Sequence, residues 1–136
     1  MIDHVSIGVS DLGKARDFYD RVMKTLGQVR NRDIDIPGQG LVAHGYGPAG
    51  QAAALWIGVP DYLNAEANRR GGVHLAFTAQ SRAAVDAFHA AAIAAGGTDN
   101  GKPGLRPHYH ADYYGAFVFD PDGNKLEAVC HRPGSR

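Results

Sequence analysis

Histidine and glutamate side chains of this 136-residue chain occur where a divalent metal could be bound. Residues 2–9 alternate between apolar and small or polar side chains, which is typical of a half-buried strand and puts His4 opposite the apolar face. The same alternation puts His74 and Glu127 on the non-apolar faces of their own strand-like stretches. Two imidazoles and one carboxylate leave positions open on the ion, so a substrate could also coordinate. We therefore predict a site for Fe²⁺, Mn²⁺, Zn²⁺ or Ni²⁺ at His4, His74 and Glu127.

An internal repeat favours this interpretation, although a lone strand histidine is more often a hydrogen-bonded structural residue than a ligand. Aligning the two halves without a gap lays His4 on His74, Phe18 on Phe88, and Gly27 on Gly97. Each half starts with a strand, continues with a capped amphipathic helix that ends at glycine, and finishes with three strand-like stretches. We predict one domain, 1–136, with a first βαβββ module at 1–59, a polar linker at 60–72 and a second module at 73–136.

The predicted fold class is α+β, with both modules forming a cupped, partly open mixed β-sheet barrel and the helices outside. In the second module we expect the last three strands at 106–110, 114–119 and 125–131. Cys130 falls on the helix-facing side by alternation and is interpreted as a small apolar packing residue. An open cup exposes strand edges, so modules must pair within one chain or between two, and we expect a homodimer.

Composition excludes several other classes of protein. The formal net charge is zero and the sequence pI is about 7.1, so no basic field would attract nucleic acid. No apolar run approaches the roughly 20 residues that cross a bilayer. A single cysteine and the lack of a leader-like N-terminus predict a cytoplasmic protein whose partner is a small molecule.

Ionisable side chains are dense before the penultimate predicted strand. If residues 105–110 are extended, Arg106, His108 and His110 face one way and could line the mouth of the cup. One histidine there could act as a general acid or base near neutral pH, with Arg106 contacting substrate. The alternative is a polar edge strand without a functional role.

Two further residues are candidates for contacts with substrate. Trp56, in the fourth predicted strand, could form the floor of an apolar pocket for an aromatic or acyl group, although burial in the core is the commoner fate of tryptophan. His44 alternates with Tyr46 on the third predicted strand and could line the same cavity. His89 and His131 are interpreted as solvated or interface residues.

Three segments resemble the vicinal oxygen chelate superfamily: IDHVSIGVSDLGKARDFY at the start, GGVHLAF in the middle and AFVFDPDGNKLEAV near the end. The superfamily includes glyoxalase I, methylmalonyl-CoA epimerase, extradiol dioxygenases, fosfomycin-resistance transferases and bleomycin-binding proteins. The resemblance covers nearly the whole chain and implies the fold predicted above. It also implies that His4, His74 and Glu127 are metal ligands, because they match the family's ligand positions.

The chain departs from parts of the family pattern. Its fourth strand reads AAALWIGV and lacks the fourth Glu or Gln ligand of glyoxalase I, which disfavours a lactoylglutathione lyase. His110 stands where the catalytic histidine of the extradiol enzymes would fall. Phe117 occupies the place of their tyrosine, and Tyr113 or Tyr114 could substitute for it.

Two functions are therefore carried forward. The first is a metal-dependent enzyme that chelates a small oxygenated substrate and performs dioxygenase, lyase or transferase chemistry. Its catalytic candidates are His108, His110 and Tyr114, and its substrate-binding candidates are His44, Trp56, Arg106 and Tyr113. The second is a metal-free binding protein that sequesters a planar molecule between aromatic side chains, as the bleomycin-binding relatives do.

Overall fold

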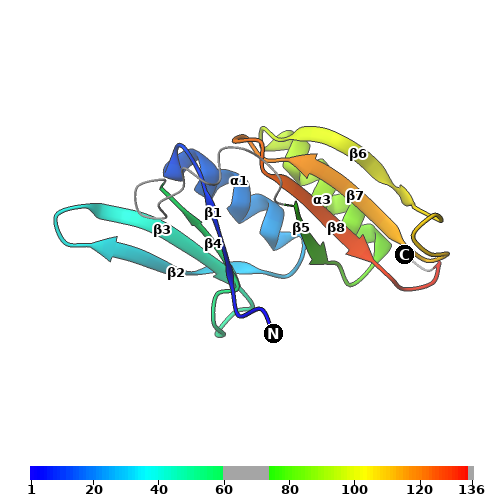
Figure 1. Cartoon of the computed structure of the whole chain (residues 1–136), viewed down its shortest axis with the longest axis horizontal. Helices are drawn as coiled ribbons and strands as arrows, with labels where there is room; N and C mark the ends of the chain where they lie inside the picture. The colour runs from blue at the N-terminus through cyan, green and yellow to red at the C-terminus, as the bar shows by residue number, and fades with distance from the viewer. Residues whose placement is uncertain (60–73, 135–136) are drawn as a thin grey trace. The chain divides into compact units, whose positions relative to one another are not determined.

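The structure is a computed structural model that describes residues 1–59 and 74–134, and the chain divides into two compact units, 1–72 and 73–136. Each unit contains a four-stranded mixed sheet with one helix packed on one face. Figure 1 labels these strands and helices along the chain. The predicted α+β class with two βαβββ modules is confirmed. The predicted linker, 60–72, lies outside the described residues.

The first unit has the strand order β1-β4-β3-β2, in which β1 and β4 are parallel and the other neighbours are antiparallel. Its helix, α1, packs against β2, β3 and β4. The elements are β1 (Val5–Gly8), α1 (Leu12–Lys24), β2 (Val29–Ile36), β3 (Gly40–Gly47) and β4 (Leu55–Gly58).

Local sequence explains where α1 begins and which face it buries. The Asp11 side chain accepts a hydrogen bond from the Lys14 backbone N–H at 3.0 Å, which satisfies one free donor of the first turn. After the helix Gly27 adopts φ 73°, a conformation open to glycine but unfavourable for most residues. One face of α1 is buried against the sheet and consists of Ala15, Phe18, Tyr19, Val22 and Met23.

The second unit repeats this plan with the order β5-β8-β7-β6, in which β5 and β8 are parallel. Ser81 caps its helix, α3, and Val85, Phe88 and Ala92 are the fully buried residues of that helix. Cys130 is buried as well. The elements are β5 (His74–Thr78), α3 (Arg82–Ala94), β6 (Thr98–Leu105), β7 (Tyr114–Phe119) and β8 (Lys125–Cys130).

The strand predicted at 106–110 is wrong. The strand that pairs with β7 is Thr98–Leu105, a segment rich in glycine and polar residues that its pairing partner holds extended. Residues 106–110 instead begin the loop between β6 and β7, where the Tyr109 N–H donates to the Arg106 carbonyl at 2.9 Å around Pro107. Proline fixes φ near the value that this kind of turn needs, so the local preference for a turn prevailed.

Among the described residues, no helix is long and apolar enough to cross a membrane.

Packing under α3 predicts a large difference between two substitutions on that helix. Phe88→Ala should lower the free energy of unfolding by about 3–5 kcal/mol, because a fully buried aromatic side chain is removed. Ile93→Ala, at a side chain that is 41% exposed, should lower it by less than about 1.5 kcal/mol. Urea denaturation of both variants measures the difference, and equal losses would contradict the packing described here.

Candidate functional site

Glu127 is an acidic residue buried in the sheet of the second unit, with 1% of its surface exposed. It lies opposite Ala76 of β5 and Phe117 of β7, in the middle of β8. Alternation along β5 puts His74 on the same face as Ala76, whereas Leu126 and Ala128 face α3. Glu127 and His74 therefore share the face of the sheet that lies away from the helix, as predicted.

The two side chains are in direct contact. His74 Nε2 lies 2.9 Å from Glu127 Oε1, and the imidazole is 40% exposed whereas the carboxylate is enclosed. A buried carboxylate without partners would be strongly unfavourable, so this contact compensates part of the cost of burial. The exposed side of His74 leaves the pair open to solvent and to a bound group.

Tyr113 binds the second oxygen of the carboxylate: its hydroxyl donates a hydrogen bond to Glu127 Oε2. Burial of the hydroxyl, together with this bond to a carboxylate, raises the pKa of Tyr113, so the phenol stays protonated as a donor. Gly115 makes room for the contact. A Cβ at that position would lie 3.2 Å from both Glu127 Oε2 and Tyr113 Cε1.

The donor set suits a borderline divalent cation. An imidazole nitrogen and a carboxylate oxygen are ligands that Fe²⁺, Mn²⁺, Zn²⁺ and Ni²⁺ all accept. The Tyr113 hydroxyl on the distal oxygen is the kind of outer contact that orients a ligating carboxylate. His74 and Glu127 thus fit two ligand positions of a metal centre.

His4 belongs to the first unit and lies just before β1, where its side chain is 52% exposed. Its Nδ1 lies 2.6 Å from Asp3 Oδ1, an arrangement that leaves the Nε2 lone pair available. Within residues 1–59 and 74–134, no three His, Cys, Asp or Glu side chains gather as metal ligands would. The convergence of His4 with His74 and Glu127 stays a prediction.

Imidazole and phenol rings cluster around the loop between β6 and β7. His110 Nδ1 accepts from the Asp112 backbone N–H at 3.1 Å, so His110 Nε2 carries the proton and donates to His131 Nδ1 at 2.8 Å. Both imidazoles pack edge-on against the Tyr113 ring, at 5.5 and 5.3 Å between centroids. His110 is therefore linked to Glu127 indirectly, by its ring contact with Tyr113 and the hydrogen bond of Tyr113 to Glu127. The His108 ring packs at a tilt against the Tyr109 ring, at 4.2 Å between centroids.

The two neighbouring tyrosines at the start of β7 have different surroundings. Tyr114, predicted as catalytic, lies on the helix side of the sheet, where its hydroxyl donates to Asp86 Oδ1 of α3 at 2.7 Å. Pairing opposite Cys130 fixes that direction, and so Tyr114 does not face Glu127. Tyr113 precedes the strand and is free to turn to the other face.

Arg106 is placed near the Glu127 face of the second unit. Its guanidinium lies 5.5 Å from the centre of the Phe117 ring, and Lys125 Nζ lies 5.4 Å from the same ring. The ring of Phe117 is also 5.9 Å from that of His74. Two cations thus flank the aromatic side chain beside the His74–Glu127 pair.

Trp56 lines a cavity of about 640 Å³ in the first unit, on the sheet face away from α1. It is partly exposed rather than buried in the core. Ser6 and His4 lie on the same wall, as their alternation predicted. The whole lining consists of Asp3, His4, Ser6, Asn31, Arg32, Ile34, Gln51, Ala52, Ala53 and Trp56.

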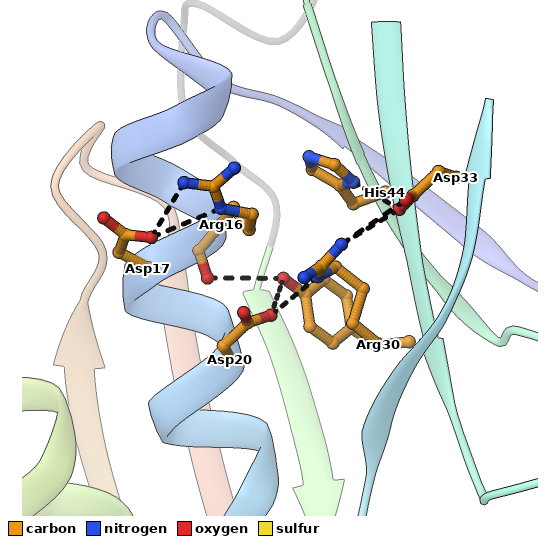
Figure 2. Close-up of polar contacts among 7 residues, drawn as sticks. Arg16, Asp17, Asp20, Arg30, Asp33 and His44 are labelled. Atoms are coloured by element: carbon orange, nitrogen blue, oxygen red, sulfur yellow. Dashed lines mark hydrogen bonds and ion pairs between the residues drawn. The ribbon is translucent and has the colours of Figure 1, made fainter. Parts of the chain in front are cut away.

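His44, predicted to line that cavity, lies on the opposite face of β3 and is 2% exposed. Its Nδ1 donates to Asp33 Oδ1 at 2.6 Å, and Arg30 bridges from Asp33 to Asp20 of α1 (Figure 2). Tyr46 shares this face and donates to Asp20 at 2.9 Å. The strand pattern could not show this direction, because His44 and Tyr46 are amphipathic and suit either face.

Several residues of the two sites were not recognised in the sequence. His131 was interpreted as a solvated or interface residue; it is exposed, and its contact with His110 was not foreseen. Arg32 and Asn31 of the first unit line the cavity, and neither belongs to a recognisable motif. For the contact between Tyr113 and Glu127, the sequence offered one signal: Gly115 is a small residue directly after two tyrosines in a predicted strand, where it could allow a close approach.

Comparisons with known proteins agree with this fold. Residues 1–128 match the family model described as the Glyoxalase/Bleomycin resistance protein/Dioxygenase superfamily. No curated protein matches the chain. A crystal structure of a glyoxalase/bleomycin resistance protein from Albidiferax ferrireducens T118 is 36% identical, with 94% of this chain and 97% of that chain covered and a TM-score of 0.78. The chain belongs to the glyoxalase/bleomycin resistance protein/dioxygenase superfamily.

More distant solved structures share the fold alone. The fosfomycin resistance protein FosX from Listeria monocytogenes is 18% identical, with coverage of 99% of this chain and 93% of that chain and a TM-score of 0.64. An E144Q glyoxalase I mutant from Zea mays is 22% identical with a TM-score of 0.64. The match covers 94% of this chain but 46% of the maize chain.

Removing the Tyr113 hydroxyl should expose the dependence of Glu127 on its partners. Tyr113→Phe leaves Oε2 of a buried carboxylate without its donor, and we expect a loss of about 1–3 kcal/mol in the free energy of unfolding. Tyr109→Phe in the same loop is the control, since Tyr109 is exposed. Chemical denaturation at neutral pH measures both, and a Tyr113→Phe variant as stable as Tyr109→Phe would contradict the contact.

The contacts of Asp33 predict part of the acid sensitivity of the first unit. The hydrogen bond from His44 is the main cause that lowers the pKa of Asp33 below its ordinary 3.8, with a contribution from Arg30. A lowered pKa stabilises the fold above the ordinary value, and this stabilisation disappears as pH falls through the folded-state pKa. Asp33→Asn should therefore be less stable than wild type near pH 7, with a difference that shrinks below about pH 4.

Melting temperatures measured across that pH range test this expectation. Asp35→Asn, on the same strand, is the matched control for the loss of one acidic group. A constant difference between Asp33→Asn and wild type down to the most acidic condition would show that Asp33 does not contribute in this way.

Proposed function

We propose that this protein is a metal-dependent enzyme that chelates a small oxygenated substrate, with His4, His74 and Glu127 as the metal ligands. The observation that supports it most is the buried Glu127 carboxylate facing His74 Nε2 at 2.9 Å on the open face of its sheet. Membership of the superfamily adds to this support. The ion would be Fe²⁺, Mn²⁺, Zn²⁺ or Ni²⁺, and when bound it supplies a Lewis acid and a template for the substrate.

Whether His4 can act as the third ligand depends on how the two modules pair. In our proposal the Nε2 of His4 is brought to His74 and Glu127, either within one chain or between the subunits of a homodimer. The bond of His4 Nδ1 to Asp3 supports this assignment, because metal-bound histidines commonly donate their other ring N–H to a carboxylate. The pairing would also cover exposed strand edges.

The remaining residues would orient the acid and handle protons. Tyr113 holds Glu127 through the distal oxygen, and His110 and His131 hold the Tyr113 ring in place. The His110 Nε2–H group donates a hydrogen bond to His131 Nδ1, so a proton could pass between these imidazoles and a substrate in contact with either. Arg106 is available for an anionic part of the substrate. The chemistry would be that of a dioxygenase or of a lyase or transferase.

A second function is favoured by the cavity of the first unit. A hollow of about 640 Å³ with Trp56 on its wall is within the size range of small-molecule sites. A metal-free protein that binds a planar molecule would need this cavity and would not need the His74–Glu127 pair. Metal binding therefore separates the two functions.

The proposal predicts metal binding that depends on His74 and Glu127. Purified without chelators and loaded with each of the four metals, the protein should bind about one ion per chain, as measured by elemental analysis and calorimetry. Glu127→Gln and His74→Ala should each weaken binding by about 100-fold or more, because changes in outer contacts alone cost 10- to 100-fold.

His89→Ala is the matched control for His74→Ala. His89 is an imidazole paired with Asp99 at 2.9 Å on the α3–β6 side of the same unit, so its loss should leave metal binding unchanged. A protein that stays metal-free after loading, or one whose affinity is the same in all variants, would reject the metal enzyme and favour the binding protein.

A further inference from the structure

A β-bulge in β2 separates two arginines that regular alternation would have placed on one face. Arg30 lies opposite Tyr46, and Arg32 lies opposite Gly45, so one extra residue, Asn31, is inserted on β2. Arg30 therefore faces α1, where it pairs with Asp20, whereas Arg32 lines the cavity on the other face. Bulges commonly redirect side chains next to binding sites.

The side chain of the bulge residue also fixes the rim of the cavity. Asn31 Nδ2 donates to the Gln51 carbonyl at 2.7 Å and to the Pro48 carbonyl at 3.3 Å. These bonds tie the loop after β3 to the bulge, and Gln51 and the residues after it form part of the cavity wall. Asn31 Oδ1 is a buried acceptor without a partner among the described residues.

Trp56 is held against the backbone of β3, since Gly45 leaves space for its ring. A Cβ at Gly45 would lie 2.9 Å from two atoms of the indole and 2.7 Å from Ala53 Cβ, so only glycine permits this placement. Ile34 and Ala53 extend the apolar surface beside the ring. One wall of the cavity therefore suits a flat apolar group.

The charge of the cavity favours an anion. Arg32 is exposed and makes no ion pair with any described residue, in contrast to Arg30. The acidic residue of the lining, Asp3, is 93% exposed at its side chain and is hydrogen-bonded to His4. A guanidinium without an acidic partner beside an aromatic wall is suited to bind a carboxylate through two parallel N–H bonds.

We propose that the cavity of the first unit binds small aromatic carboxylates, with the ring against Trp56 and the carboxylate on Arg32. This assignment names the ligand class for the proposed function, where His4 both lines the cavity and supplies a metal ligand. It differs from that function in needing neither the metal nor Glu127. The assignment also gives the bulge in β2 a role, because the bulge places Arg32 in the cavity.

The single tryptophan makes the test direct, because intrinsic tryptophan fluorescence reports on Trp56 alone. The protein is titrated in EDTA with benzoate, with benzyl alcohol, which lacks the charge, and with cyclohexanecarboxylate, which lacks the aromatic ring. Benzoate should give saturable quenching and bind about tenfold or more tightly than either of the other two.

Arg32→Gln should remove the preference for benzoate over benzyl alcohol and leave the affinity for benzyl alcohol unchanged. Arg21→Gln is the matched control, since it removes one exposed positive charge from α1, away from the cavity. Both positions are exposed, so both variants should remain folded, which circular dichroism would check. Calorimetry gives the same affinities without relying on fluorescence.

Equal affinities for benzoate and benzyl alcohol, an Arg32→Gln variant that behaves as wild type, or no saturable quenching by benzoate would each overturn the assignment. Failure of the metal proposal is a separate result. A protein that binds benzoate in EDTA but never binds metal would keep this inference and reject the enzyme. A protein that binds metal through Glu127 but not benzoate would do the reverse.

Discussion

The buried carboxylate of Glu127 is the constraint on which the second unit depends. A carboxylate enclosed in a sheet is unfavourable unless its oxygens are engaged, and here His74 holds one oxygen and Tyr113 the other. The partners of the Glu127 carboxylate in turn depend on other residues. The lack of a side chain at Gly115 lets Tyr113 approach closely, and His110 and His131 pack on the Tyr113 ring. An apolar residue would satisfy the packing of β8 at this position without any of these partners.

The two units share one plan but present different side chains on their open faces. In each, a helix covers one face of a mixed sheet and leaves the other face for polar or aromatic residues. The first unit presents a cavity with Trp56 and Arg32, and the second presents His74 and Glu127. A duplicated module keeps its core pattern because packing under the helix demands it, whereas the open face tolerates change. This is the physical basis on which one superfamily can support several reactions.

The tyrosine that contacts the acid comes from a loop rather than from the strand. Phe117 lies directly opposite Glu127 on β7, where it has no hydroxyl to offer, and instead packs near His74 and two cations. Tyr113 reaches the carboxylate from the end of the loop between β6 and β7. Loops change more freely than strands, since their backbone is not bound by sheet pairing. A hydrogen-bond donor can therefore be supplied from a new position without disturbing the sheet.

The sequence by itself determined the modules, the helices and the faces of β1, β5 and β8, because alternation, capping residues and the internal repeat are local patterns. His4, His74 and Glu127 were found on the open faces for that reason. Only the tertiary structure decided between Tyr113 and Tyr114, placed His44 under α1 and turned Arg32 into the cavity. Each of these outcomes depends on sheet register, on a bulge or on a turn, and such features are set by pairing with distant residues. The segment 98–105 shows the same limit, since its composition disfavours a strand and its partner β7 makes it one.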